Sequence, residues 1–113
     1  MPANPRPELS HPRLDDVPLV AVLHALSDPT RLAIVETLTR DVDGRACGTF
    51  PVNVAPSTLS HHFKVLREAG VIWQQERGNR RWTSLRAEEL DLRFPGLLQV
   101  VTGEVRGRRA ADR

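Results

Sequence analysis

The stretch STLSHHFKVLREAGVIWQQERGNRRWTSLR, residues 57–86, decides the fold of this 113-residue chain. Its first part predicts an amphipathic helix, because Leu59, Phe63 and Leu66 recur at the spacing that places side chains on one helix face. We expect Ser57 to be the N-cap, because a serine hydroxyl accepts a hydrogen bond from a free N–H of the first turn. The stretch therefore opens with a helix whose apolar face must be buried.

A glycine and a β-hairpin follow this predicted helix. Gly70 is expected to end the helix, because glycine accepts the left-handed backbone conformation that commonly follows the last helical residue. Residues 71–73 and 81–85 are typical of strands, and Gly78-Asn79 between them tolerates the positive φ angles of a tight turn. The sequence therefore predicts a helix followed by a two-stranded wing with a basic tip.

The opposite face of the predicted helix carries short polar side chains and then cations. Small donors and acceptors can reach base edges in a DNA major groove, and cations can reach phosphates. Residues 57–86 hold six Lys or Arg and two Glu, a formal charge of +4 against +2 for the whole chain, so the positive charge is concentrated here. The candidate DNA-binding residues are Ser57, Thr58, Ser60, His61, Lys64, Arg67, Arg77, Asn79, Arg80 and Arg81.

Each group of candidates is expected to make its own kind of contact. Ser57, Ser60 and His61 would read base edges or contact nearby phosphates. Lys64 and Arg67 would hold phosphates, and the asparagine and arginines of the hairpin turn would reach the backbone or the adjacent minor groove. Any surface helix is polar outside, but the cationic turn, which contains no acidic residue, favours DNA.

These residues resemble the winged helix-turn-helix of the ArsR/SmtB family of bacterial transcriptional repressors. The matching segments are residues 57–72, residues 78–81 and an upstream segment, LSDPTRLAIV, at residues 26–35. The resemblance covers roughly residues 17–103. It implies a mainly α fold with a small β-hairpin wing, in a homodimer that represses transcription. The operator would be an inverted repeat in the target promoter, with half-sites about 10 bp apart.

The length of the chain fits one domain. Residues 1–13 contain four prolines and are expected to form a flexible N-terminal arm. Residues 14–105 would form the winged helix-turn-helix domain for DNA binding and dimerisation, and residues 106–113 a flexible basic tail.

Two further helices are expected before the central stretch. Asp15 or Asp16 can cap the first of them, and Asp28-Pro29 is a typical start for the second, with Asp as N-cap and Pro as the first helical residue. Arg31 in the second helix is expected to pair with a nearby carboxylate rather than with a phosphate.

Apolar side chains on the first and last helices suggest a dimer surface. The resemblance implies that these two helices pack together and form part of the interface between two copies. The last helix could also close the core of its own chain, and both roles can hold at once. The candidate dimer residues are Leu19, Val20, Leu23, Leu97, Leu98 and Val101.

Residues 40–55 are expected to depart from the family pattern. The family has the first helix of the helix-turn-helix about here, but Gly48 and Pro51 leave room only for a short or irregular helix. Phe50 and Val54 are expected to pack under the recognition helix in its place.

No metal site, cofactor or catalytic residue is expected. Cys47 is the single cysteine, so a cysteine pair of the kind that family metal sensors use is missing from the chain. His61 and His62 are neighbours that point about 100° apart on a helix. A redox-responsive repressor that acts through Cys47 is an alternative, although a buried inert cysteine is favoured. No Gly-rich phosphate motif suggests an enzyme.

The composition agrees with a protein that acts on DNA in the cytoplasm. The isoelectric point is about 9.5, and no apolar run reaches the roughly 20 residues of a membrane span. No signal peptide is evident at the start. The expected partners are double-stranded DNA and a second copy of the chain. Two forms of control stay open: an unidentified small-molecule effector, or the abundance of the protein itself. A winged-helix module for protein–protein interaction is the alternative from another class.

Overall fold

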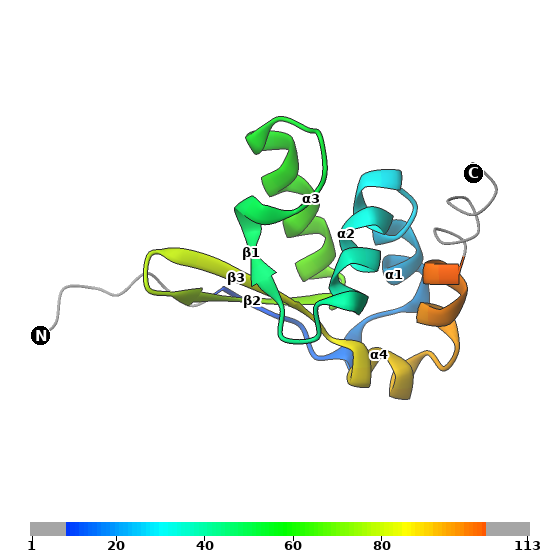
Figure 1. Ribbon diagram of the computed structural model, residues 1–113. Coiled ribbons are helices and arrows are strands. Elements are labelled where there is room, and N and C mark those ends of the chain that lie inside the picture. Colours follow the sequence, from blue (N-terminus) through cyan, green and yellow to red (C-terminus); the bar gives the residue numbers. More distant parts are fainter. Residues whose placement is uncertain (1–8, 104–113) are drawn as a thin grey trace, which may run out of the picture.

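Helices α1 (Leu19–Ala25), α2 (Pro29–Arg40) and α3 (Pro56–Glu68) pack together, and a small sheet lies against them (Figure 1). The computed structural model describes residues 9–103, and every structural statement below concerns these residues. The fold is mainly α with a small β-wing, as the sequence predicted.

Shorter helical segments complete the described chain. Single 3-10 turns, η1 (Leu14–Asp16) and η2 (Cys47–Thr49), precede α1 and α3. Helix α4 (Ala87–Arg93) follows the sheet, and residues 97–103 are helical. Side chains from α1, α2, α3, the sheet, α4 and residues 97–103 meet in one core, whose members include Val22, Ile34, Leu38, Leu66, Ile72, Leu90 and Leu98.

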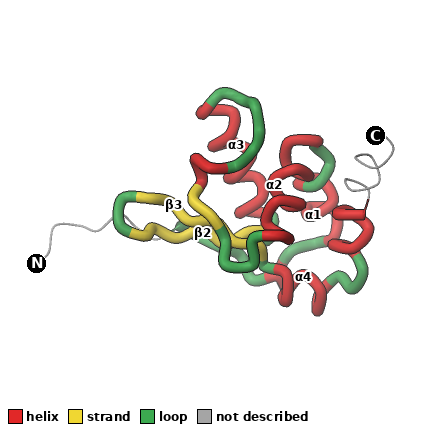
Figure 2. The backbone as a smooth tube through the Cα atoms, viewed as in Figure 1, coloured by secondary structure: helices red, strands yellow, loops and turns green. Residues whose placement is uncertain are grey.

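The sheet consists of three antiparallel strands in the order β1–β3–β2. Strands β2 (Ile72–Arg77) and β3 (Arg80–Leu85) form the predicted hairpin, whose turn lies well away from the helices (Figure 2). Only Gly78 in this turn has a positive φ, +64°, which fits a turn with glycine in its first central position. Strand β1 (Arg45–Ala46), which pairs with β3, was not predicted from the sequence.

The start of α3 differs from the prediction. The helix begins at Pro56 with Ala55 as N-cap, and no side chain caps it, so the assignment of Ser57 as N-cap was wrong. Proline suits the first helical position because its φ is already helical and the N–H that it lacks would have no partner there. The helix therefore starts two residues earlier than it would with Ser57 as the N-cap.

The predicted start was wrong for α1 and correct for α2. Asp15 and Asp16 belong to η1, and α1 starts after Pro18 with no side-chain cap, so these aspartates do not cap it. Helix α2 starts as predicted, because the Asp28 carboxylate accepts a hydrogen bond from the Arg31 N–H at 3.0 Å and Pro29 is the first helical residue.

Residues 41–55 contain no α-helix, in agreement with the expected departure from the family pattern. Phe50 is buried and its ring meets Phe63 edge to face, with centroids 5.2 Å apart. Val52, rather than Val54 as predicted, packs against the core. A tight turn follows Phe50, in which the Val52 N–H donates to the Phe50 carbonyl at 2.9 Å. This turn directs Val52 toward the core.

Gly70 ends α3 as predicted. Its φ is +77°, the Gly70 N–H donates to the Arg67 carbonyl, and the Val71 N–H donates to the Leu66 carbonyl, both at 3.0 Å. This pair of hydrogen bonds is the Schellman arrangement, which satisfies carbonyls at the helix end. The turn also directs the chain into β2, so it fixes where the wing leaves the helix.

Replacing Gly70 by alanine should therefore destabilise the fold. An added Cβ would lie 2.6 Å from Leu14 Cδ2, and the positive φ is unfavourable for any residue with a side chain. We expect a loss of about 2 kcal/mol and a fall in Tm of roughly 10 °C. Thermal unfolding measures this, with Gly48→Ala as control because no atom lies within 4 Å of its added Cβ. Equal Tm values for the two variants would contradict this account of the turn.

No helix in residues 9–103 combines the length and apolar character that a bilayer crossing requires.

Candidate nucleic-acid interface

Helix α3 is exposed over its first turns and buries one face along its second half. Residues 56–61 are exposed except for half-buried Leu59, whereas His62, Phe63 and Leu66 are buried. The first turns of α3 lie at the top of Figure 1, beyond the other helices. The half of α3 that carries the hydroxyl side chains thus faces solvent.

The structure places the candidates of α3 on this open side. Ser57, Thr58, Ser60 and His61 are all exposed. Lys64 is also exposed, and its Nζ lies 3.8 Å from a carboxylate oxygen of Glu68, one turn further along. An exposed pair of this kind is weak, so it leaves the lysine free to turn toward another anion.

The hairpin turn gathers a second group of exposed polar and cationic side chains. Arg77, Asn79, Arg80 and Arg81 are all exposed there. Arg77 lies directly opposite Arg80 in the strand register, and like charges in such a pair repel each other. An anion near the turn would relieve this repulsion, which favours a phosphate as a partner.

Neighbouring side chains restrain two of these arginines without burying them. The Arg77 guanidinium stacks over the Trp82 ring at 4.7 Å from its centroid. Arg81 Nη2 lies 3.3 Å from a carboxylate oxygen of Glu76. The wing therefore offers cations that are partly ordered and still accessible.

Arg67 is in a different position from the other candidates. It is half-buried, and its Nη1 donates a hydrogen bond to Gln74 Oε1 at 2.7 Å. It therefore lies at the junction of α3 and the wing.

Arg31 holds α3 against the end of α1. It is buried, and its Nε donates to the Ala25 carbonyl at 2.6 Å while its Nη1 meets His62 Nδ1 at 2.9 Å. The predicted pairing of Arg31 with a carboxylate was wrong, because the guanidinium turns to this carbonyl and to the imidazole. Since arginine only donates, His62 Nδ1 is the acceptor of this hydrogen bond.

Asp28 lies at the edge of the same cluster, 3.9 Å from His62 Nδ1. Burial alone would raise the pKa of Asp28. The hydrogen bond from the Arg31 N–H and the electrostatic effects of His62 and Arg31 outweigh burial, so the pKa lies below its ordinary value. The charged carboxylate is thus the stable form in this cap.

Arg86 belongs to the positively charged stretch of residues 57–86, but it is not part of the exposed surface of α3 and the hairpin turn. Its Nε and Nη2 donate to both carboxylate oxygens of Glu89, at 2.7 and 3.0 Å, and its Nη1 donates to the Pro12 carbonyl at 2.8 Å. The hydrogen bonds from Arg86 hold the pKa of Glu89 below its ordinary value. This buried arginine is therefore a structural residue at the base of the wing.

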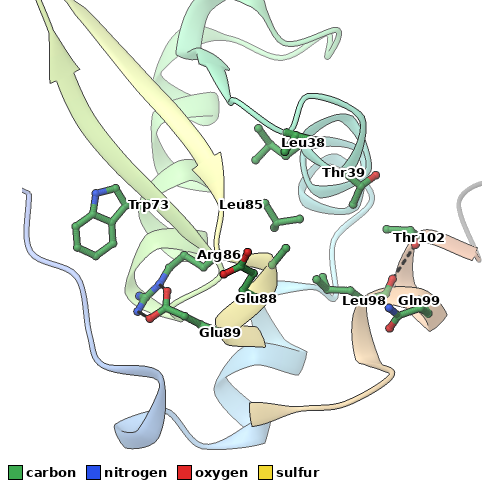
Figure 3. A pocket seen from close by; sticks show the side chains of 12 residues that line it. Leu38, Thr39, Trp73, Leu85, Arg86, Glu88, Glu89, Leu98, Gln99 and Thr102 are labelled. Carbon is green, nitrogen blue, oxygen red and sulfur yellow. Dashed lines mark hydrogen bonds and ion pairs between the residues drawn. The ribbon is translucent and has the colours of Figure 1, made fainter. Parts of the chain in front are cut away.

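A groove lies beside this ion pair, between the base of the hairpin, α2, α4 and the last described helix (Figure 3). Its volume is about 710 Å³. Leu38, Leu85 and Leu98 supply an apolar wall, and Glu88 adds a carboxylate.

Residues 9–103 contain no group of three His, Cys, Asp or Glu side chains placed to hold a metal ion. Cys47 is half-buried, and its Sγ lies 3.1 Å from Thr83 Oγ1.

The candidate dimer residues divide into two groups. Leu19, Val20 and Leu23 of α1 are 46, 72 and 45% exposed. Leu97 and Val101 are half-buried against the core, and Leu98 lies in the core of its own chain, where it has little surface to offer a partner. Val100, which was not a candidate, is 72% exposed.

Sequence reasoning missed two contacts that hold the wing. Residues 9–13 of the expected arm lie within the described chain, and the His11 ring stacks on Trp73 with centroids 3.9 Å apart. Gln74 is buried between the strands and α3. Its position two residues after Ile72, on the same strand face, was a signal that a polar group is buried there.

Comparison with known proteins points to one family. A family described as a helix-turn-helix domain matches residues 26–74. The uncharacterized HTH-type transcriptional regulator YceK of Bacillus subtilis (strain 168) is 35% identical over 89 residues, which cover 77% of this chain and 89% of that protein.

Two solved structures are similar in fold. One is the crystal structure of an ArsR family transcriptional regulator, with a TM-score of 0.57 and 26% identity over 64% of this chain and 74% of that chain. The other is an ArsR-like transcriptional regulator from Rhodococcus sp. RHA1, with a TM-score of 0.60 and 24% identity over 83% of this chain and 87% of that chain.

Proposed function

Since this chain belongs to the ArsR-like winged helix-turn-helix transcriptional regulators, which bind DNA, we propose that it is a homodimeric repressor of promoters that carry an inverted repeat. Each α3 would enter the major groove, and each wing would contact the flanking backbone or minor groove. Repression would follow because the bound dimer occludes the promoter. The proposal places the protein in the cytoplasm and includes no catalytic role.

The observation that carries the proposal is the arrangement of α3 and the wing. Helix α3 buries its apolar face and exposes Ser57, Thr58, Ser60 and His61 on the other. The hairpin turn, whose arginines are exposed, extends away from the helices (Figure 1). Short hydrogen-bonding groups beside cations are suited to base edges and phosphates respectively.

Dimerisation forms part of the proposal, and the exposed apolar side chains of α1 support it. Leu19, Val20 and Leu23 expose large apolar side chains on one short helix. Val100 adds a further exposed apolar side chain on the last described helix, whose other side packs into the core through Leu98. Exposed apolar groups that lie together commonly mark an interface.

Control by a small-molecule effector is a further part of the proposal. The groove in Figure 3 has a volume in the range of ligand sites, roughly 300–1,000 Å³, and it is lined by apolar and by polar side chains. Trp73 and Leu85 of the hairpin line it together with Leu38 of α2. A bound compound would therefore contact both the wing and the helices that support α3.

Titration of the purified protein into a labelled inverted repeat, selected from random-sequence DNA, tests this function. Three phosphate contacts from each copy should weaken binding about a thousandfold between roughly 50 and 200 mM salt. Fluorescence anisotropy at the two salt concentrations measures the change. Absence of salt-dependent DNA binding would contradict the proposal and favour a module for protein–protein interaction.

A further inference from the structure

One buried side chain connects the recognition helix to the wing. Gln74 of β2 is 2% exposed, so both ends of its amide need partners within the protein. Its Oε1 accepts the hydrogen bond from Arg67 Nη1 at 2.7 Å. Its Nε2 donates to Thr83 Oγ1 at 3.1 Å and to Cys47 Sγ at 3.3 Å. Four chain segments, α3, β2, β3 and η2, thus meet at this amide.

The chemistry of the partners fixes which way the amide points. Arginine has only donors, so the atom of Gln74 that faces Arg67 must be the oxygen. The NH2 group then faces the Thr83 hydroxyl and the Cys47 thiol, which lie 3.1 Å from each other and can accept. Thr83 is fully buried, so this end of the cluster has no access to water. The orientation of Gln74 is therefore determined by both ends at once.

This arrangement leaves most of the Arg67 guanidinium available. Only Nη1 has a partner among the described residues, and Arg67 is half-buried, so its Nε and Nη2 remain to bind an anion at the surface. A guanidinium that is already held loses less conformational freedom when it binds a phosphate. The ordering of Arg67 thus depends on a residue that itself cannot reach DNA.

We propose that Gln74 is a positioning residue for DNA binding. It holds Arg67 at the junction of α3 and the wing, where the free N–H groups of the guanidinium meet a DNA phosphate. This inference rests on the proposed function, and it assigns a role to a residue that makes no contact with DNA.

A double-mutant cycle between Gln74 and Arg67 tests the proposal. Gln74→Met keeps the side-chain length and removes both hydrogen-bonding groups. It should lower the affinity for the inverted repeat about threefold to tenfold and leave the salt dependence unchanged, since the Arg67 charge remains. Arg67→Met should reduce the slope of log Kd against log salt by about 0.9 for each copy in the complex. In the Arg67→Met background, Gln74→Met should change the affinity by less than about twofold.

Gln75→Met is the matched control, because Gln75 is the next residue of β2 and is exposed. It should leave the affinity unchanged in both backgrounds. If Gln74→Met lowers the affinity by the same factor with and without Arg67, Gln74 is merely structural and the proposal is overturned. A changed salt slope in Gln74→Met would overturn it as well.

A measurement on the unbound protein keeps the proposal testable if Gln74→Met folds poorly. The Arg67 guanidinium of the wild type should give resolved NMR signals of an ordered side chain, and Gln74→Glu should retain them because it keeps an acceptor oxygen. A mobile Arg67 in the wild type would overturn the inference even if DNA binding is normal. Loss of salt-dependent DNA binding by the wild type would instead show that the proposed function itself is wrong, and the inference would fall with it.

Discussion

Replacing Arg80 and Arg81 together by alanine should weaken binding to DNA of any sequence and flatten its salt dependence. Each phosphate contact releases counterions and adds about 0.9 to the slope of log Kd against log salt. Two contacts for each copy should therefore remove about 1.8 from that slope per copy. At physiological salt we expect a loss in affinity of roughly 30-fold for each wing.

The structure explains why these two residues should act mainly on affinity. Both side chains are exposed at the wing turn, and neither contributes to the core. Arg80 faces Arg77 across the strands, so its removal also relieves a repulsion in the free protein. The double variant should accordingly fold as well as the wild type, and the change should lie in DNA binding.

Anisotropy titrations at several salt concentrations measure this slope, with Arg13→Ala as control. Arg13 is also an exposed arginine, but it pairs with Asp15 near the start of the described chain rather than at the turn. It should leave the slope unchanged. If the double variant keeps the wild-type slope, the wing does not contact phosphates and must be removed from the proposed interface.

The second large effect is expected from Val20→Glu, which should prevent dimerisation. Val20 is 72% exposed in the single chain, so a glutamate there costs the monomer little. In a dimer the same position would bury a carboxylate without a partner, which is strongly unfavourable. The affinity for the inverted repeat should fall about 100-fold or more, because the two half-sites are no longer bound by one linked unit.

Sedimentation velocity and anisotropy titration together check this prediction. The wild type should sediment as a dimer and Val20→Glu as a monomer. Leu92→Glu is the control, because Leu92 is 84% exposed on α4 and lies outside the proposed interface. A variant Val20→Glu that remains dimeric would show that α1 is not part of the interface.

Local signals in the sequence were sufficient for much of the fold. Asp28-Pro29 starts α2 and Gly70 ends α3, since each acts through hydrogen bonds within one turn of the chain. Gly78-Asn79 closes the hairpin for the same reason. The apolar spacing of α3 also predicted which side of that helix is buried. Where two local signals competed, as Pro56 and Ser57 did, the sequence did not show which one decides the start of the helix.

The tertiary structure decided the features whose partners are distant in the sequence. Arg31 meets His62 rather than a carboxylate, and Gln74 meets Arg67 and Cys47. Strand β1 is only two residues long, and it forms because it pairs with β3. Leu98, an expected dimer residue, lies in the core of its own chain because the last described helix folds back on it.

The sequence by itself determined the family, the positions of the recognition helix and wing, and which side chains are candidates for DNA contacts, because these follow from periodicity, turn residues and charge along short stretches. Only the tertiary structure decided how α3 is held against α1 and the wing. Buried polar groups such as those of Arg31 and Gln74 take whichever partners the packing brings to them, and those partners lie far away along the chain.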